Sequence, residues 1–193
     1  MRLRWVLTLV GAKEHIPYDR LLLSKDYLSG SLDEADLALW PVQEYGNRDI
    51  ELSLGVPAVR LAAAERRLIL GDGRQLRYDR LIIATGGQPT QPALKHPAVL
   101  SLRDLRDAAR LRKALAQCPR LVIIGGGFVG CELAAAATAN GTAVTMVEAA
   151  RSPLGQVLGP EVGGASLPCT VPTVSTSGPE SLPARWRMGQ TER

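Results

Sequence analysis

Short apolar runs separated by turn residues predict that the first half of the chain is rich in strands. Leu81–Ala84 is a compact apolar run typical of a strand buried in a parallel sheet, whereas Ile50–Leu54 alternates like a half-buried strand. The Asp72-Gly73 pair predicts a hairpin turn. Further strands are predicted at Leu3–Val10, Val59–Leu61, Arg67–Leu70 and Leu76–Arg77, and turns or short helices at Pro17–Gly30 and Asp33–Tyr45.

The second half combines two helical patterns with two strands. Apolar residues recur at roughly helical spacing over Leu102–Gln117, and an alanine-rich helix is predicted over Phe128–Ala139. Apolar strands flank the second helix at Leu121–Ile124 and Ala143–Val147. A strand, a helix and a strand in this order form a βαβ unit, so the sequence predicts an α/β fold with a parallel sheet.

A glycine-rich turn joins the strand at Leu121–Ile124 to the following helix. Gly125, Gly127 and Gly130 fill the G-x-G-x-x-G positions, which permit a tight turn, close approach to a pyrophosphate and close packing of helix and strand. Glu148 follows Gly125 by 23 residues, which suits an acid that binds a ribose 2′-hydroxyl. The pattern predicts a dinucleotide site. The alternative is a glycine-rich turn in another kind of α/β protein.

Composition narrows the classes of function. The 193 residues are 46% hydrophobic and 22% charged, as in a globular protein. The net charge of +4 comes from arginines spread along the chain, and aromatic residues make up only 4%, which argues against nucleic-acid binding. The three cysteines form no C-x-x-C pair, and no apolar run is long enough to span a membrane. We therefore expect a cytoplasmic protein with no metal site.

Four segments can be compared with known families. They are PYDRLLLSKDYLSG at Pro17–Gly30, YDRLIIATGGQPTQPAL at Tyr78–Leu94, IIGGGFVGCELAA at Ile123–Ala135 and LGPEVG at Leu158–Gly163. In order and spacing they resemble flavin-dependent ferredoxin reductases of the putidaredoxin- and rubredoxin-reductase types, within the pyridine nucleotide-disulfide oxidoreductase superfamily. The resemblance covers about residues 3–164.

The resemblance implies an oxidoreductase. In that family two Rossmann-type domains bind FAD and NAD(P)H, and the flavin passes single electrons to an iron–sulfur protein. The implied cofactors are FAD and NAD, and the implied partner is a small acidic electron-transfer protein such as a ferredoxin or rubredoxin. Leu22–Lys25 lies where disulfide-reducing relatives carry a cysteine pair, which favours a one-electron acceptor. Glu148 favours NADH, because a carboxylate repels a 2′-phosphate, while Arg151 leaves NADPH open.

The resemblance also implies roles for single residues. Lys25 matches a lysine near the isoalloxazine and Glu132 matches a glutamate near the nicotinamide, so both are expected to be catalytic. From the residues alone, a lysine at a helix start is the better interpretation of Lys25. For Glu132, a partner of the helix dipole is as good an interpretation as a catalytic residue. The residues expected to contact cofactors are Arg20, Lys25, Ala84, Thr85, Gly86, Gly125, Gly127, Phe128, Val129, Gly130 and Glu148.

The sequence departs from the family pattern at both ends. No strand, glycine turn and helix precede the first strand, and after about residue 164 the chain is rich in Ser, Thr and Pro without a structural period. We expect a Rossmann-like fold that is incomplete at both ends. It would comprise a partial FAD-binding domain (residues 1–100), a partial NAD(P)-binding domain (101–164) and a disordered tail (165–193). Two alternatives stay open: an inactive remnant or nucleotide-binding module without FAD, and a fragment completed by a second copy or another chain.

Overall fold

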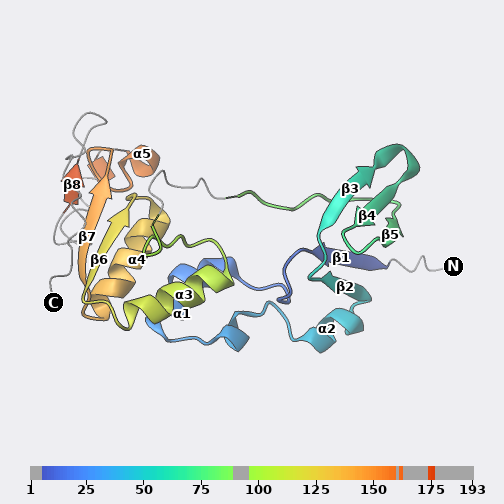
Figure 1. The fold of residues 1–193 in the computed structure, drawn as a ribbon, viewed down its shortest axis with the longest axis horizontal. Helices are drawn as coiled ribbons and strands as arrows, with labels where there is room; N and C mark the ends of the chain where they lie inside the picture. The colour runs from blue at the N-terminus through green and yellow to red at the C-terminus, as the bar shows by residue number, and fades with distance from the viewer. Residues whose placement is uncertain (1–5, 89–95, 160, 163–173, 177–193) are drawn as a thin grey trace. The chain divides into compact units, whose positions relative to one another are not determined.

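The structure is a computed structural model that describes residues 6–88, 96–159, 161–162 and 174–176 (Figure 1). The chain divides into two compact units. The first comprises Met1–Arg20 and Asp33–Lys95, and the second comprises Leu21–Leu32 and His96–Arg193. The expected domain boundaries stay a prediction. The units differ from them because the segment Leu21–Leu32, here called the crossover segment, packs with the second unit, and because that unit begins again at His96.

The first unit contains a two-stranded parallel sheet. Strand β1 (Leu7–Gly11) pairs with β2 (Ile50–Leu54), which confirms the second strand as predicted and the first in its described part. Between them lie the short helices η2 (Glu34–Leu37) and α2 (Val42–Asn47). Pro41 immediately precedes α2, where its missing N–H costs no helical hydrogen bond.

A three-stranded antiparallel sheet follows in the first unit. It consists of β3 (Ala58–Ala62), β4 (Arg67–Leu70) and β5 (Gln75–Arg77), with the short helix η3 (Ala63–Glu65) between the first two strands. The predicted hairpin turn joins β4 to β5. Gly73 there has a φ of +89°, a left-handed conformation that glycine adopts at little cost.

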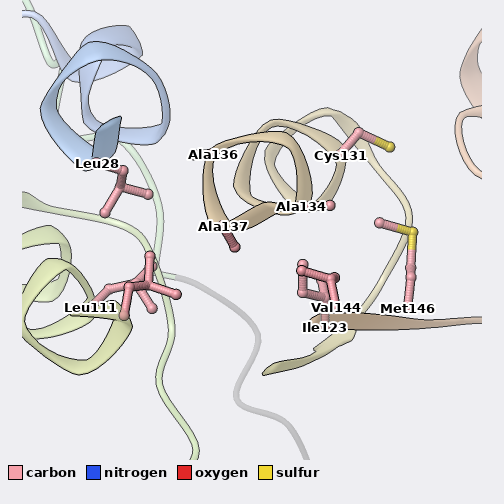
Figure 2. Close-up of a cluster of buried hydrophobic side chains, with 10 residues drawn as sticks. Leu28, Leu111, Ile123, Cys131, Ala134, Ala136, Ala137, Val144 and Met146 are labelled. Carbon is pink, nitrogen blue, oxygen red and sulfur yellow. The ribbon is translucent and has the colours of Figure 1, made fainter. Parts of the chain in front are cut away.

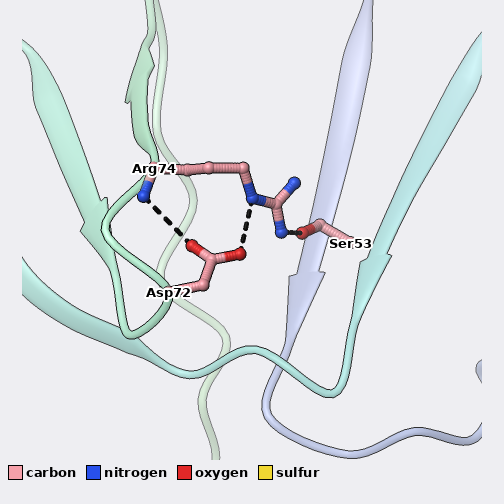
Figure 3. Close-up of polar contacts among 3 residues, drawn as sticks. All are labelled: Ser53, Asp72 and Arg74. Atoms are coloured by element: carbon pink, nitrogen blue, oxygen red, sulfur yellow. Dashed lines mark hydrogen bonds and ion pairs between the residues drawn. The ribbon is translucent and has the colours of Figure 1, made fainter.

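Arg74 ties this turn to the other sheet of the first unit, as Figure 3 shows. Its Nε donates to the Asp72 carboxylate at 2.6 Å, and its Nη2 donates to Ser53 Oγ on β2 at 2.8 Å. The backbone N–H of Arg74 also donates to Asp72, and this bond does most to hold the pKa of the Asp72 carboxyl below its ordinary value. One arginine therefore links both sheets of the unit.

The buried strand predicted at Leu81–Ala84 is absent. Residues 81–88 have no regular secondary structure, and the side chains of Ile82 and Ile83 are 85% and 69% exposed. An apolar run forms a buried parallel strand only where neighbouring strands and covering helices supply hydrogen bonds and apolar contacts. Among the described residues, the first unit supplies neither at this position, so the prediction is wrong.

The second unit contains a parallel sheet in the order β6–β7–β8, built from β6 (Arg120–Ile124), β7 (Ala143–Glu148) and β8 (Val174–Thr176). Helix α4 (Phe128–Ala139) connects β6 to β7 and lies against the sheet (Figure 1). The predicted βαβ unit and the Rossmann-like α/β class are thus confirmed.

Strand β8 lies within residues 165–193, for which the sequence predicts a disordered tail. Val174–Thr176 pairs in parallel with β7, and the disorder of the tail stays a prediction. The edge of β7 offers backbone groups with which another strand can pair. The rest of that tail lies outside the described residues.

The core of the second unit lies where α4 meets the sheet and the helices α1 (Asp26–Ser29) and α3 (Leu105–Leu115) (Figure 2). Ala134 and Ala137 are completely buried, and their small side chains allow close packing of α4. Asp104 caps α3 by accepting a hydrogen bond from the Asp107 backbone. The buried cluster consists of Leu28, Leu111, Leu115, Ile123, Cys131, Ala134, Ala136, Ala137, Val144 and Met146. Two short helices complete the described elements, η1 (Arg20–Ser24) and α5 (Gly155–Leu158).

Candidate functional site

The glycine turn between β6 and α4 has the geometry that its motif predicts. Gly125 has a φ of +104°, and its N–H donates to the Val147 carbonyl at 2.9 Å. A Cβ on Gly130 would lie 2.1 Å from the Gly125 carbonyl oxygen, so only glycine lets α4 start this close to β6. At Gly127, in contrast, a Cβ would meet nothing within 4 Å. That open space is what a pyrophosphate needs to approach the backbone.

The first turn of α4 adds donors to the same place. Phe128 and Val129 open the helix directly after Gly127, and both side chains are about half exposed. The first N–H groups of a helix have no intrahelical acceptor, and the helix dipole places partial positive charge there. The described residues of the turn and the helix therefore fit the phosphates of a dinucleotide.

Glu148 ends β7 and reaches back to the glycine turn. Its Oε2 accepts the Gly126 backbone N–H at 2.5 Å, and its Oε1 accepts the Ala150 N–H at 2.8 Å. A carboxylate has about four acceptor positions, so Glu148 can hold the turn and still accept a hydrogen bond from a ribose hydroxyl. The sequence predicts only the ribose contact. The spacing of the motif predicts that the acid lies near the turn, but it does not predict the hydrogen bond to Gly126.

Lys25 and Glu132, the two residues expected to be catalytic, lie together in the second unit. Lys25 Nζ is 2.8 Å from Glu132 Oε1, and Ser24 Oγ donates to Glu132 Oε2 at 2.5 Å. Burial alone would raise the pKa of the Glu132 carboxyl, but the hydrogen bonds from Lys25 and Ser24 and the charge of Lys25 outweigh it and lower the pKa. Glu132 is thus an anion held by one cation and one hydroxyl.

Ser24 is a residue of this site that no sequence pattern indicates. Its side chain is 7% exposed, and Glu132 gives its hydroxyl a strong acceptor in this buried position. The two residues are 108 positions apart in the sequence, so no local pattern reveals their contact. The only sequence signal is that Ser24 precedes Lys25.

Cys131 is a buried residue of α4 that directly precedes Glu132. It is 8% exposed, and its S–H donates to the Gly126 carbonyl at 3.6 Å. Burial, with smaller contributions from the negative charges of Glu148 and Glu132, raises the pKa of the Cys131 thiol. A buried neutral thiol is a poor nucleophile, so Cys131 packs rather than reacts.

The other residues expected at the flavin lie in the first unit. Arg20, Ala84, Thr85 and Gly86 are all exposed, and the last three belong to the segment without regular structure. Among residues 6–20 and 33–88, no strand leads through a glycine turn into a helix as β6 leads into α4. The flavin contacts expected at these residues stay a prediction.

In the described part of the chain, every helix is too short or too polar to span a bilayer. The described residues also contain no group of three or more His, Cys, Asp or Glu side chains that could hold a metal ion.

Several known reductases are similar in sequence to this chain. The chain is 40% identical over 161 residues to rhodocoxin reductase of Rhodococcus erythropolis, covering 82% of this chain and 38% of that protein. It is 44% identical over 147 residues to the ferredoxin–NAD(+) reductase component of the p-cumate 2,3-dioxygenase system of Pseudomonas putida, covering 75% and 36%. The chain therefore spans about two fifths of the length of these relatives.

Solved structures of reductases have a similar fold. The fold matches the reductase in the covalent putidaredoxin reductase–putidaredoxin complex with a TM-score of 0.81 and 34% identity, covering 89% of this chain and 43% of that one. It matches the ferredoxin reductase for the CYP199A2 system from Rhodopseudomonas palustris with a TM-score of 0.82 and 30% identity, covering 89% and 44%. The model of the pyridine nucleotide-disulphide oxidoreductase family matches residues 4–167. With the glycine turn, the acid on β7 and these relatives in agreement, the chain belongs to the pyridine nucleotide-disulphide oxidoreductase family.

Proposed function

We propose that this chain carries the NADH-binding unit of an FAD-dependent NAD(P)H oxidoreductase of the ferredoxin-reductase type. The observation that carries the proposal is the glycine turn, in which Gly127 leaves open space beside the first turn of α4 while Glu148 holds Gly126. A pyrophosphate would bind the backbone N–H groups there, and an adenosine ribose would bind Glu148. Bound NADH supplies a hydride for transfer.

By the family resemblance, Lys25 would act near the isoalloxazine of FAD and Glu132 near the nicotinamide. Their ion pair fixes a negative and a positive charge on defined atoms, and the second unit alone forms it. Preorganised charges of this kind orient a bound ring and stabilise charge that develops on it. The pair supports a catalytic role for both residues, because both charges are already in position before the substrate binds.

Glu148 supports NADH as the preferred dinucleotide. Its carboxylate lies at the turn, where a 2′-phosphate on the ribose would meet a negative charge. Arg151, three residues later and exposed, would have to approach the ribose to favour NADPH instead.

The acceptor side of the proposal rests on the relatives. Ferredoxin–NAD(+) reductases of this family use FAD and NAD(H). The relatives include proteins named as reductases of rhodocoxin, putidaredoxin and rubredoxin. By analogy, the electrons would pass through FAD to a small acidic protein of the ferredoxin or rubredoxin type. A cytoplasmic location likewise remains a prediction, from the scattered cysteines.

Calorimetric titration of the chain with NADH tests the proposal. Gly127→Ala adds a Cβ into open space, so it should preserve the melting temperature. The same Cβ should hinder the pyrophosphate and weaken NADH binding by about tenfold or more, or ~1.4 kcal/mol. NADPH should bind more weakly than NADH. Equal affinity of the wild-type protein and Gly127→Ala would refute the proposed site.

The second candidate is a dinucleotide-binding module that does not hold FAD. The exposed, irregular segment 81–88 favours it, because the flavin contacts expected at Ala84–Gly86 have no strand to support them. Visible absorbance of the chain after addition of FAD and desalting separates the two candidates. A retained flavin band supports the reductase, and a colourless protein that still binds NADH supports the module.

A further inference from the structure

The position of Lys25 depends on how the crossover segment is held. Leu23, Tyr27 and Leu28 bury this segment in the second unit, with 2–5% of each side chain exposed. Leu28 belongs to the core cluster (Figure 2), whereas Lys25 stands at the N-cap of α1 and is partly exposed. Apolar burial anchors the segment, but it does not by itself fix the direction of Lys25.

Arg112 on α3 makes two different contacts with the crossover segment. Its Nη1 donates to the Leu32 carbonyl at 3.3 Å, and its Cζ lies 5.0 Å from the centre of the Tyr27 ring. A planar guanidinium can interact with an aromatic face and donate to a carbonyl at the same time, which a lysine ammonium does less well. Arg112 therefore contacts the helix of the segment and its C-terminal end together.

The turn after α1 brings these two contacts within reach of one side chain. Gly30 ends α1 with a φ of +84°, and a Cβ there would lie 3.6 Å from Arg112 Nη2. The backbone N–H groups of Ser31 and Leu32 both donate to the Asp26 carbonyl, at 2.9 and 3.1 Å. The chain thus folds back on α1, and Leu32 returns to the helix start beside Lys25.

From these contacts we propose that Arg112 is a positioning residue, which clamps the crossover segment onto α3 and thereby holds Lys25 against Glu132. The clamp is a property of the fold, whereas its meaning for catalysis rests on the function proposed above. Without Arg112, the turn after α1 would open more often, and the bonds from Lys25 and Ser24 to Glu132 would be made for less of the time.

NMR of the full chain tests the clamp without any cofactor. The variants are Arg112→Met and Arg112→Lys, with Arg110→Met as the control, because Arg110 is exposed on the same helix and carries the same charge. One readout is amide hydrogen exchange at Gly30, Ser31 and Leu32. The other is titration of the Glu132 carboxyl by its ¹³C shift, which reports the bonds from Lys25 and Ser24.

Arg112→Met should speed exchange at these three amides about tenfold, as expected for loss of a charged hydrogen bond and a cation–π contact. The pKa of Glu132 should rise toward its ordinary value. Arg112→Lys should shift both readouts in the same direction by less, and Arg110→Met should shift neither. Unchanged readouts in Arg112→Met, or equal effects in the control, would overturn the proposal and leave apolar burial as the anchor.

Exchange in α4 shows whether a variant still folds. If the amides of Ala134–Ala137 lose their protection from exchange in Arg112→Met, this variant no longer folds normally, and Tyr27→Leu is tested in its place. Tyr27→Leu removes the ring contact but keeps an apolar side chain in the core. Fast exchange in Tyr27→Leu that is confined to Gly30–Leu32 supports the clamp, and wild-type exchange there overturns it. Since neither readout needs NADH or FAD, a failed clamp is distinguishable from a failed proposed function.

Discussion

The two units of this chain differ in how continuous their buried apolar core is. In the second unit Met146 and Ala134 are completely buried, and the core is continuous from α1 to β7. In the first unit Leu7, Val59 and Ile82 are 55–85% exposed, and the strands belong to two separate sheets. The glycine turn and the Lys25–Glu132 pair both lie in the unit with the covered core. A continuous core therefore accompanies the organised polar site.

This difference has a physical reason. A polar group holds its geometry only if the backbone beneath it is fixed, and packing of apolar side chains supplies most of that rigidity. Glu132 projects from α4, whose buried face carries Ala134 and Ala137, so the ion pair is built on a packed helix. The segment with Ala84–Gly86 has no comparable support among the described residues.

The largest expected effect is in the core of the second unit. Met146→Ala should lower its free energy of unfolding by about 2–5 kcal/mol, because the substitution leaves a cavity under α4. The matched substitution Ile82→Ala in the first unit should change stability by less than about 0.5 kcal/mol, since that side chain is already in water. Urea unfolding followed through amide signals of each unit measures both. An equal loss of unfolding free energy in the two variants would contradict the contrast between the units.

Gly130→Ala should have the next largest effect. The new Cβ must displace the Gly125 carbonyl, at a cost of about 1–3 kcal/mol, and the distorted turn should lose NADH binding. The control is Gly46→Ala in α2, where a Cβ meets nothing within 4 Å and alanine favours the helix. Thermal melts and NADH titrations test the pair. A Gly130→Ala protein with wild-type stability would show that the close contact between α4 and β6 is not required.

Acid should weaken the ion pair of the second unit. The folded state lowers the pKa of Glu132, so this carboxylate adds stability above the ordinary pKa of glutamate. That stability should be lost as the pH falls through the lowered value. In Glu132→Gln this part of the pH dependence should disappear, and Lys25→Met should cost about 1 kcal/mol at neutral pH. Urea unfolding of the second unit between pH 3 and 7 is the measurement. An unchanged pH profile in Glu132→Gln would mean that Glu132 titrates normally.

The smallest expected effect concerns the first unit. Arg74→Met removes the hydrogen bond to Ser53 and the pair with Asp72, and it should cost little stability, because both groups of the pair are well exposed. Amide exchange in β2 and in the β4–β5 hairpin should rise together. Arg77→Met, at an exposed position on β5, should leave exchange in β2 unchanged. If exchange rises only in the hairpin of Arg74→Met, this arginine does not link the two sheets.

The contrast between the units also explains where sequence-based prediction succeeds. The strand at Ile50–Leu54 and the helix at Phe128–Ala139 have the predicted bounds, because alternation and a glycine turn are local signals. The predicted strand at Leu81–Ala84 is wrong, because its burial depends on neighbours that no local pattern contains. Strand β8 is not predicted from the sequence, because it forms by pairing with the edge of β7 and has no periodic sequence pattern of its own.

The same division applies to the candidate site. The sequence singles out Lys25 and Glu132 separately, through the family resemblance, and the structure joins them. Ser24 and Arg112 complete the arrangement through contacts over 108 and 80 positions of sequence, which spacing rules do not reach. The FAD contacts expected at Arg20 and Ala84–Gly86 stay predictions.

The most direct test of the account is to map NADH on the chain by amide NMR. If the second unit carries the dinucleotide site, NADH should shift the signals of Gly125, Gly127, Phe128 and Val129, and these shifts should be lost in Gly127→Ala. Glu148→Ala should reduce the shifts without removing them, because the phosphate donors remain. Saturable shifts elsewhere, or none at millimolar NADH, would contradict the central claim that the glycine turn of this chain binds a nicotinamide dinucleotide.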